Sequence, residues 1–461
     1  MAPRSRSLHR LPFVGAVALF LVAASVVTQA GDAGVPAKPA ADRPNIVVIV
    51  ADDLGWANVG FHSAAAFTPN LDRMAKDGTE LARFYAYPVC SPTRAALLTG
   101  RMPRRWGIVD ALNGRDRGLP AGLVTLPALL RGAGYTTSLI GKWHLGTGAT
   151  PQQDGFDRFY GFLGAQIDYM KHVNQRGLPD WQRDGTPVEE AGYSTDLLAA
   201  EAVRQIKARA ADRPFYVQLC FNAPHDPVTA PPELLEKHQA KGAKAGPLAA
   251  AIESLDAGIG RVLQAIDDDK LRDRTLVVFF SDNGGASREG GSNAPLRAAK
   301  GTVYEGGIRT DALVRWPGVV AAGAKLEQPI AAQDLLPTLC AVAGTKVPEG
   351  TVLDGTDQWP AIRAGKPAAR PAFAVAAYDV AVIDGDWKLI VPQQGERQLY
   401  NLKDDPSERT DLLAKDPATA ARLGAAMDAL LTDVPAAPKR SDRPRPGAAP
   451  GGNAPRKPRN P

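Results

Sequence analysis

Cysteine is scarce in this chain, with three among 461 residues. So few thiols exclude a disulfide scaffold, even for a protein made in an oxidising compartment. Cys220 ends an apolar strand pattern and Cys340 lies in an apolar helical pattern. We therefore expect both to be small buried hydrophobes, with a bridge between them as the alternative. Cys90 stands instead at the start of a helical pattern.

The body of the chain also lacks the positive charge that a net charge of +5 suggests. Residues 1–30 carry a charge of +3 and residues 435–461 a net +6, which leaves the segment between them mildly acidic, at about −4. Binding to a phosphate backbone depends on lysine and arginine. The sequence therefore predicts no nucleic-acid partner.

An apolar run over residues 11–27 follows Arg4, Arg6 and Arg10, and small residues ending at Ala30 come after it. This order is typical of a secretory signal peptide, and the run is near the lower limit for spanning a bilayer. We expect cleavage near Ala30, export to the periplasm or the extracellular space, and no stable membrane insertion afterwards. An uncleaved N-terminal anchor is the alternative.

The length of the chain predicts two domains. A hydrophobic fraction of 44% and a charged fraction of 22% are ordinary for a soluble globular protein. We predict a signal peptide at 1–30, a linker at 31–43 and a large N-terminal domain at 44–354. A small C-terminal α+β domain at 355–434 and a disordered, basic, Pro-rich tail at 435–461 complete the expected organisation.

In the larger domain, apolar β-branched runs alternate with helical patterns. The expected strands are residues 45–50, 135–140, 215–221, 275–280 and 308–316, and the expected helices are 71–76, 92–98, 126–131, 194–208, 247–266 and 333–342. Such alternation predicts an α/β fold, a large mainly parallel sheet sandwiched by helices. Short runs at 372–378, 381–383, 387–390 and 398–401 then predict a smaller antiparallel sheet, with one packed helix at 418–431.

Acidic and amide side chains follow two of these strands. Asp52 and Asp53 come directly after the first strand, and Asp282 and Asn283 follow the strand at 275–280. Ligands of open α/β sheets bind beyond the carboxyl ends of the strands, so both pairs are expected in one crevice. Carboxylate and amide oxygens suit Ca²⁺ or Mg²⁺ and not a thiolate-preferring metal. Helix capping is the alternative for the Asp-Asp pair alone.

The segment that begins Cys90-Ser91-Pro92-Thr93-Arg94 continues to a Thr-Gly-Arg at residues 99–101. Pro92 is tolerated in the first turn of a helix, and Arg94 then lies one turn from Cys90 on the same face. This places a guanidinium beside a thiol at a helix N-terminus, where anions are favoured. Plain packing is the alternative for Cys90.

Basic residues and histidines follow other strands. Lys142 and His144, in Gly-Lys-Trp-His-Leu-Gly, come after the strand at 135–140, and His225, in Asn-Ala-Pro-His-Asp-Pro, follows the strand at 215–221. Lys300 begins Lys-Gly-Thr-Val-Tyr-Glu-Gly-Gly-Ile-Arg. Histidine exchanges protons near neutral pH, and ammonium groups stabilise developing negative charge. The alternative for Lys142 and His144 is a loop with a solvated lysine and a packed histidine, and the alternative for His225 is a turn histidine bonded to backbone.

Together these motifs resemble the type I sulfatases of the alkaline-phosphatase-like superfamily, and the resemblance covers residues 44–434. Within this family, the chain is similar in particular to the arylsulfatase B and N-acetylgalactosamine-sulfatase groups. The resemblance implies that a formylglycine-generating enzyme oxidises Cys90 to formylglycine during maturation. The hydrated aldehyde is a geminal diol, of which one hydroxyl attacks sulfur and the second later expels the product.

The resemblance also assigns the site residues. Asp52, Asp53, Asp282, Asn283 and the modified Cys90 are implied ligands of Ca²⁺, with Mg²⁺ as the less favoured ion. Among the catalytic residues, Arg94 and Lys142 are implied to hold the nucleophile and the sulfate. His144 is implied to take a proton from the second hydroxyl, and His225 and Lys300 to assist the departing alcohol.

The segment 160–172 lies where many sulfatases bind their substrates. Its candidates for substrate contact are Gln166, Asp168, Tyr169, Lys171 and His172, and His62 is a candidate for the entrance to the site. The expected substrate is a sulfated small molecule or glycan, with a sulfated carbohydrate favoured. A phosphonate or phosphate ester hydrolase of the same superfamily is one alternative. A catalytically inactive protein that binds sulfated glycans is another.

Overall fold

The computed structural model describes residues 43–113, 116–240 and 246–442, which belong to one compact unit. The predicted signal peptide and nearly all of the predicted linker lie outside the described residues. No helix within the described ranges is long and apolar enough to cross a bilayer.

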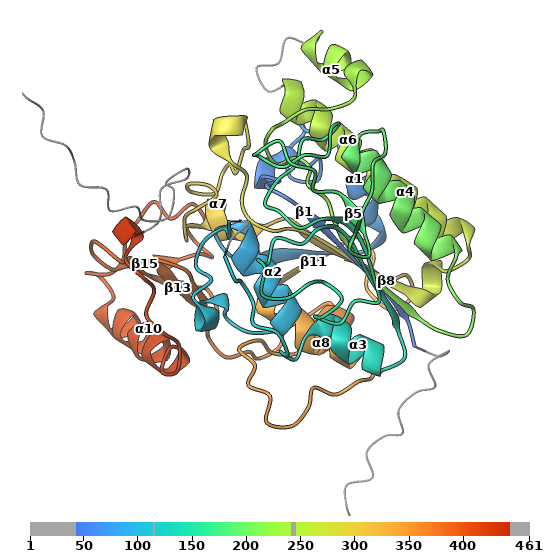
Figure 1. Ribbon diagram of the computed structural model, residues 1–461. Helices are drawn as coiled ribbons and strands as arrows, with labels where there is room; N and C mark the ends of the chain where they lie inside the picture. Colours follow the sequence, from blue (N-terminus) through green and yellow to red (C-terminus); the bar gives the residue numbers. More distant parts are fainter. Residues whose placement is uncertain (1–42, 114–115, 241–245, 443–461) are drawn as a thin grey trace, which may run out of the picture. The chain divides into compact units, whose positions relative to one another are not determined.

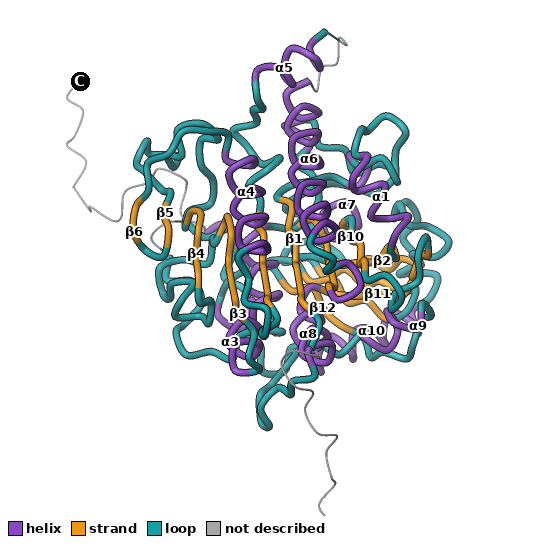
Figure 2. Tube along the Cα trace, turned by 90° about the vertical axis from the view of Figure 1, so that its right-hand side faces the viewer, coloured by secondary structure: helices purple, strands orange, loops and turns teal. Residues whose placement is uncertain are grey.

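A large mixed sheet of eleven strands forms the centre of the unit (Figures 1 and 2). Across the sheet the order is β11 (Ala324–Ala331), β2 (Thr79–Tyr85), β10 (Ala312–Arg315), β8 (Thr275–Ser281), β1 (Asn45–Ala51), β7 (Phe215–Cys220), β3 (Thr136–Lys142), β4 (Arg158–Phe162), β5 (Gln182–Arg183) and β6 (Thr186–Pro187), with β9 (Arg309–Thr310) paired to β2. The strands β8, β1, β7, β3 and β4 run parallel to one another, whereas β10 is antiparallel to both of its neighbours. The predicted α/β fold is confirmed.

Helices cover both faces of this sheet because successive side chains of a buried strand point to opposite sides. Val47 and Ile49 of β1 pack with α1 (Pro69–Asp77), α4 (Ser194–Lys207) and α6 (Gly246–Asp268) on one face. Ile46 and Val48 pack with α2 (Cys90–Thr99), α3 (Leu126–Gly132) and α8 (Leu335–Ala343) on the other. Shorter helices are α5 (Pro232–Gln239), α7 (Glu305–Ile308) and α9 (Trp359–Ala364).

A smaller antiparallel sheet follows, as the sequence predicts. Its strands are β12 (Phe373–Ala376), β13 (Val380–Asp384), β14 (Trp387–Val391) and β15 (Gln398–Asn401), in chain order, with α10 (Pro417–Leu430) packed beside it (Figure 1). A turn at Asp384-Gly385 joins β13 and β14, and Gly385 has a φ of 56°, which glycine adopts at little cost.

Two of the expected segments have a different structure. The apolar run at 308–316 is not one strand, because α7, β9 and β10 divide it. Residues 435–442, expected to be part of a disordered tail, make ordered contacts through their carbonyl groups. Arg104 Nε donates to Pro435 O at 2.8 Å and Gln393 Nε2 donates to Pro438 O at 2.7 Å.

Candidate active site

Strands β1 and β8 bring the two acidic pairs to one place. In their parallel register Ala51 lies opposite Ser281, so Asp52 and Asp282 leave the sheet at the same level. Asp282 N donates to Ala51 O at 3.0 Å, which ties the two strand ends together. Both carboxylates are fully buried. The predicted crevice at the carboxyl ends of these strands therefore contains charged groups that are out of contact with water.

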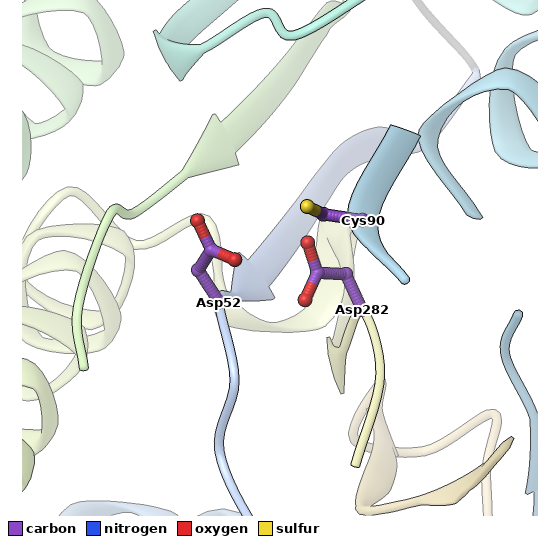
Figure 3. A group of neighbouring side chains, drawn as sticks. All are labelled: Asp52, Cys90 and Asp282. Carbon is purple, nitrogen blue, oxygen red and sulfur yellow. The ribbon is translucent and has the colours of Figure 1, made fainter. Parts of the chain in front are cut away.

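Helix α2 points its first residue at this crevice. Figure 3 shows the sulfur of Cys90 and the carboxylates of Asp52 and Asp282 directed toward one another, and their candidate ligand atoms all lie within 4.8 Å. Arg94 follows one helical turn later. Its Nη2 donates to Asp282 Oδ2 at 2.8 Å and its Nη1 donates to Lys142 O at 3.0 Å. The spacing of the Cys-x-x-x-Arg motif thus places the thiol and the guanidinium beside the same carboxylate.

Two lysines neutralise the remaining carboxylates. Lys142 Nζ donates to Asp52 Oδ2 at 2.5 Å, and Lys300 Nζ donates to Asp53 at 2.7 Å. Burial opposes ionisation of Asp52, but Lys142 and neighbouring cations outweigh it and hold its pKa well below the usual range. Burial, with Asp52 nearby, raises the pKa of Asp282 to about 6 despite Arg94. Burial also works against the charge of Lys300, yet Asp53 keeps its pKa above the usual range.

His144 is held in an uncommon backbone conformation, with a φ of 55°. Its Nε2 lies 2.8 Å from Leu112 O, and its Nδ1 is buried without a hydrogen-bond partner among the described residues. Burial and the nearby Lys142 lower the pKa of His144 well below the usual value. The ring is therefore neutral near pH 7, with Nε2 as the donor to Leu112 O and Nδ1 as a free acceptor.

His225 lies beyond the end of β7. Its Nδ1 is 2.7 Å from Asp226 O, and its Nε2 is 3.7 Å from Asp53 Oδ2. With Asp52 and Asp53 it forms a second group whose side-chain ligand atoms lie within 4.8 Å of one another. The geometry thus brings His225 closer to the predicted metal ligands than the sequence indicated.

The thiol of Cys90 is itself poorly suited to nucleophilic attack. Only 1% of the residue is exposed, and burial raises its pKa above the usual value even though Lys142 and Lys300 lie nearby. The reactive form of cysteine is the thiolate. An unmodified Cys90 would therefore stay protonated near neutral pH.

The acidic crevice contains oxygens suited to a cation. Asp52 Oδ1 and Asn283 Oδ1 are buried and have no hydrogen-bond partner within the described parts of the chain. Asn283 Nδ2 donates to Asp53 Oδ1 at 2.7 Å, so the amide oxygen of Asn283 is the atom left available. Unsatisfied buried oxygens are costly, and a hard divalent cation would satisfy them. The residues present therefore fit the predicted Ca²⁺ site.

A cavity of about 1260 Å³ opens over this crevice. Among the predicted site residues, Cys90, His144, His225 and Lys300 line it. The other six predicted residues lie behind this lining, buried against one another: Asp52, Asp53, Arg94, Lys142, Asp282 and Asn283. The site thus divides into groups that reach the cavity and charges that act from beneath it.

The candidates for substrate contact are divided by the structure. Gln166 lines the cavity, whereas Tyr169 is buried and its hydroxyl donates to His225 O at 2.8 Å. His172 stacks on Trp181, with ring centroids 4.6 Å apart. Asp168 and Lys171, the remaining candidates of this loop, are also absent from the cavity wall.

His62 does not line the cavity either. Its Nε2 lies 3.0 Å from Glu80 Oε1 and its Nδ1 lies 2.7 Å from Asp311 Oδ1. Its ring stacks on Trp56, with centroids 3.9 Å apart. His62 therefore belongs to a buried charge cluster and not to the entrance.

Sequence reasoning missed two further features of the site. The hydroxyls within the cysteine motif fasten the site loops, because Thr93 Oγ1 donates to Asp282 O at 2.6 Å and Ser91 Oγ donates to His144 O at 2.9 Å. The cavity also extends to Tyr378, Asp379 and Arg440 of the C-terminal region. The serine and threonine inside the cysteine motif were a sequence signal for these hydrogen bonds. Nothing in the sequence indicated that the cavity reaches the C-terminal region.

Comparison with known proteins gives a consistent result. The sulfatase family profile matches residues 44–345. Human N-acetylgalactosamine-6-sulfatase is 36% identical over 369 residues, which cover 74% of this chain and 70% of the human protein. Human arylsulfatase A is 33% identical, over 80% of this chain and 83% of its own. The crystal structure of Ps i-CgsB, also solved with k-i-k-neocarrahexaose, superposes with a TM-score of 0.79 at 36% identity and covers 85% of this chain and 94% of its own.

Proposed function

This chain belongs to the sulfatase family, within the alkaline-phosphatase-like superfamily, and on that basis we propose how it hydrolyses sulfate esters. The proposal has three parts. The nucleophile is residue 90 after oxidation to formylglycine, the metal is Ca²⁺, and the substrates are sulfated carbohydrates. The observation that carries the first two is the convergence of Cys90, Asp52 and Asp282 within 4.8 Å at the base of a cavity.

The environment of residue 90 supports an oxidised side chain. A buried thiol with a raised pKa attacks poorly, whereas a hydrated aldehyde at the same position offers an oxygen nucleophile and a second hydroxyl to complete the cycle. The surrounding motif is buried from Cys90 to Thr99. A formylglycine-generating enzyme would therefore have to act before this helix packs, which makes it a partner during maturation and not afterwards.

The carboxylates of Asp52, Asp53 and Asp282 and the amide oxygen of Asn283 would hold Ca²⁺ together with residue 90. When bound, the ion supplies Lewis-acid polarisation of oxygens at the site. The preference for Ca²⁺ over Mg²⁺ stays a prediction based on the resemblance to sulfatases.

The basic residues stabilise the negative charge that spreads over the sulfate oxygens. Lys300 reaches the cavity, while Arg94 and Lys142 act from behind residue 90, where low exposure strengthens their fields. Each of these cations is anchored to a carboxylate or a carbonyl, so none has to reorganise during the reaction.

Proton transfers fall to the two histidines that line the cavity. His144 has Nδ1 free as an acceptor, which suits removal of a proton from the second hydroxyl at residue 90. His225 lines the cavity, and because its Nδ1 donates to Asp226 O, the ring in its imidazolium form can donate from Nε2 to the oxygen of the departing alcohol. Lys300 can assist the same oxygen.

The substrate class rests on the relatives. Human N-acetylgalactosamine-6-sulfatase and the hexaose-bound Ps i-CgsB are named for sugar sulfates or solved with a saccharide, and both are 36% identical to this chain. We propose a sulfated carbohydrate here, acted on after export. The predicted signal peptide at residues 1–30 is the support for export.

The competing activity is hydrolysis of phosphate or phosphonate esters. To separate the two, we would measure release of 4-nitrophenol from its sulfate and its phosphate esters by the purified protein and by Cys90→Ala. We expect kcat/KM to favour the sulfate by at least about 100-fold, and Cys90→Ala to lose nearly all turnover because the nucleophile is gone. A preference for the phosphate would refute the proposed activity, and full turnover by Cys90→Ala would refute the proposed nucleophile.

A further inference from the structure

The cavity above Cys90 is larger than most small-molecule sites. Its volume is about 1260 Å³, whereas pockets for compact ligands usually measure roughly 300–1,000 Å³. One part of its wall carries Cys90, His225 and Lys300, and another part comes from Tyr378, Asp379 and Arg440. The space therefore extends from the reactive centre to residues that the proposed chemistry does not use.

The chain after α10 contributes Arg440 to this additional wall. Arg105 Nη1 donates to Asp433 O at 3.3 Å, and Arg104 Nε donates to Pro435 O at 2.8 Å. The side-chain amide of Gln393 makes two hydrogen bonds to the backbone of residues 438–440. Its Nε2 donates to Pro438 O and its Oε1 accepts from Arg440 N, each at 2.7 Å. Arg440 is thereby fixed at the edge of the cavity by its backbone.

The side chains on this wall form an ordered cluster. Arg440 Nη2 donates to Asp379 Oδ2 at 3.0 Å, and Gln393 N donates to Asp379 Oδ1 at 2.9 Å. The Arg440 guanidinium lies 5.2 Å from the ring centroid of Tyr378. Because 54% of the Arg440 side chain stays exposed, its N–H groups are only partly engaged by Asp379.

These groups match the chemistry of a sugar ring. A pyranose has a face of C–H groups that packs on an aromatic ring, and a rim of hydroxyls that both donate and accept hydrogen bonds. Asp379 offers acceptors, Arg440 offers donors in a planar fork, and Tyr378 offers the apolar face. A small aryl ester placed at Cys90 needs none of them.

We propose that Tyr378, Asp379 and Arg440 form a distal subsite, which binds a sugar unit adjoining the one whose sulfate ester is cleaved. This inference rests on the proposed sulfatase activity toward carbohydrates, and it adds that the preferred substrate is an oligosaccharide and not a sulfated monosaccharide. The residues act on specificity, because they select substrate length without touching the ester.

The test compares substrates of different length on the full chain. Sulfate release is measured from 4-nitrophenyl sulfate, from N-acetylgalactosamine 6-sulfate, and from hexasaccharides of chondroitin 6-sulfate and κ-carrageenan. The variants are Arg440→Ala and Tyr378→Ala. Arg422→Ala is the matched control, because it removes an exposed arginine that pairs with Asp384 in the same region but away from the cavity.

We expect the wild-type protein to prefer a hexasaccharide to the monosaccharide. Each subsite variant should lower kcat/KM on that hexasaccharide by about 10-fold. In all three variants, the rate on 4-nitrophenyl sulfate should stay within about two-fold of the wild-type rate, which also shows that the variants fold. Equal losses on both substrates, no loss on the hexasaccharide, or no advantage of length would overturn the subsite. If the wild-type protein releases sulfate from none of these esters, the proposed function itself would be overturned.

Discussion

Asp282 is the residue on which the cationic and anionic parts of the site depend together. Its carboxylate accepts from Arg94 Nη2, its backbone oxygen accepts from Thr93, and it faces Cys90. Burial raises the pKa of Asp282 to about 6, so the protein keeps this carboxylate at an electrostatic cost. Binding of a divalent cation would offset that cost.

Replacement of Asp282 by alanine is therefore expected to remove Ca²⁺ binding and to lower kcat by at least about 100-fold. Calorimetric titration with Ca²⁺ gives a readout that does not depend on turnover. Asp384→Asn, which alters a partly exposed carboxylate of β13 away from the cavity, is the control. Unchanged Ca²⁺ binding by Asp282→Ala, or normal activity of the wild-type protein under strong chelation, would contradict the metal assignment.

His62 shows how a histidine that looks functional in the sequence becomes structural in the fold. Burial alone would lower its pKa, but Asp311 and Glu80 outweigh burial and raise it to about 9. The charged ring therefore stabilises the folded state fully below its usual pKa of 6.5. This stabilisation is lost as the pH rises through about 9.

To test this, the free energy of unfolding of the wild-type protein and of His62→Gln is measured by urea denaturation at pH 7 and pH 9.5. The difference in free energy of unfolding should shrink by ~2 kcal/mol toward the higher pH, because the folded state then no longer binds the extra proton. Titrating groups that do not contact His62 are shared by the two proteins and cancel, whereas Asp311 and Glu80, whose pKa values the ring lowers, contribute to the difference. A difference that does not change between the two pH values would show that His62 is uncharged.

At the scale of elements, a buried lysine joins the smaller sheet to the large one. Lys388 of β14 is fully buried, and its Nζ lies 2.8 Å from Glu305 Oε1 of α7 and 2.9 Å from Glu408 Oε1. Glu408 Oε2 accepts from Glu305 N at 2.7 Å. Glu408 thus ties the C-terminal region to the helix that follows Lys300.

Lys388→Met is expected to lower the free energy of unfolding by about 3–5 kcal/mol, because two buried carboxylates would lose the lysine between them and only Glu305 would keep a cation, Arg309 at 3.6 Å. Urea denaturation measures the loss. Arg422→Ala, which breaks an exposed pair, should cost less than about 1 kcal/mol. Equal effects of the two substitutions would mean that the buried network contributes nothing beyond a surface pair.

The limits of sequence reasoning are also clearest among the elements. The strands β1, β7 and β8 were predictable because both of their faces are buried and most of their residues are apolar. Strand β2 was missed because it contains Arg83, whose charge is satisfied far along the chain by Asp386. Strand β11 was missed because Pro329 interrupts its pattern, and the register shifts between Leu326 and Pro329.

The site was predictable to the extent that local rules apply to it. Side chains at the carboxyl ends of parallel strands converge, which brought Asp52, Asp282, Lys142 and His225 together as expected. No local rule places Arg440 at the cavity that His225 also lines, since the position of Arg440 depends on how the chain returns after α10.

For the molecule as a whole, we predict an exported enzyme whose two ends differ in charge from the part between them. Residues 1–30 and 435–461 carry the positive charge, and the part between them is mildly acidic. Protein recovered from the periplasm or the medium should begin near Gly31, as N-terminal sequencing would show. Protein retained in membranes with Met1 intact would indicate an uncleaved anchor instead.

The proposed mechanism depends on the chemical state of residue 90. Trypsin cleaves after Arg83 and Arg94, so one peptide, residues 84–94, carries this side chain, and its mass distinguishes aldehyde from thiol. Across preparations made with and without a formylglycine-generating enzyme, specific activity toward 4-nitrophenyl sulfate should rise in proportion to the fraction of the lighter, aldehyde-containing peptide. Full activity in a preparation whose peptide carries only the thiol would contradict the account.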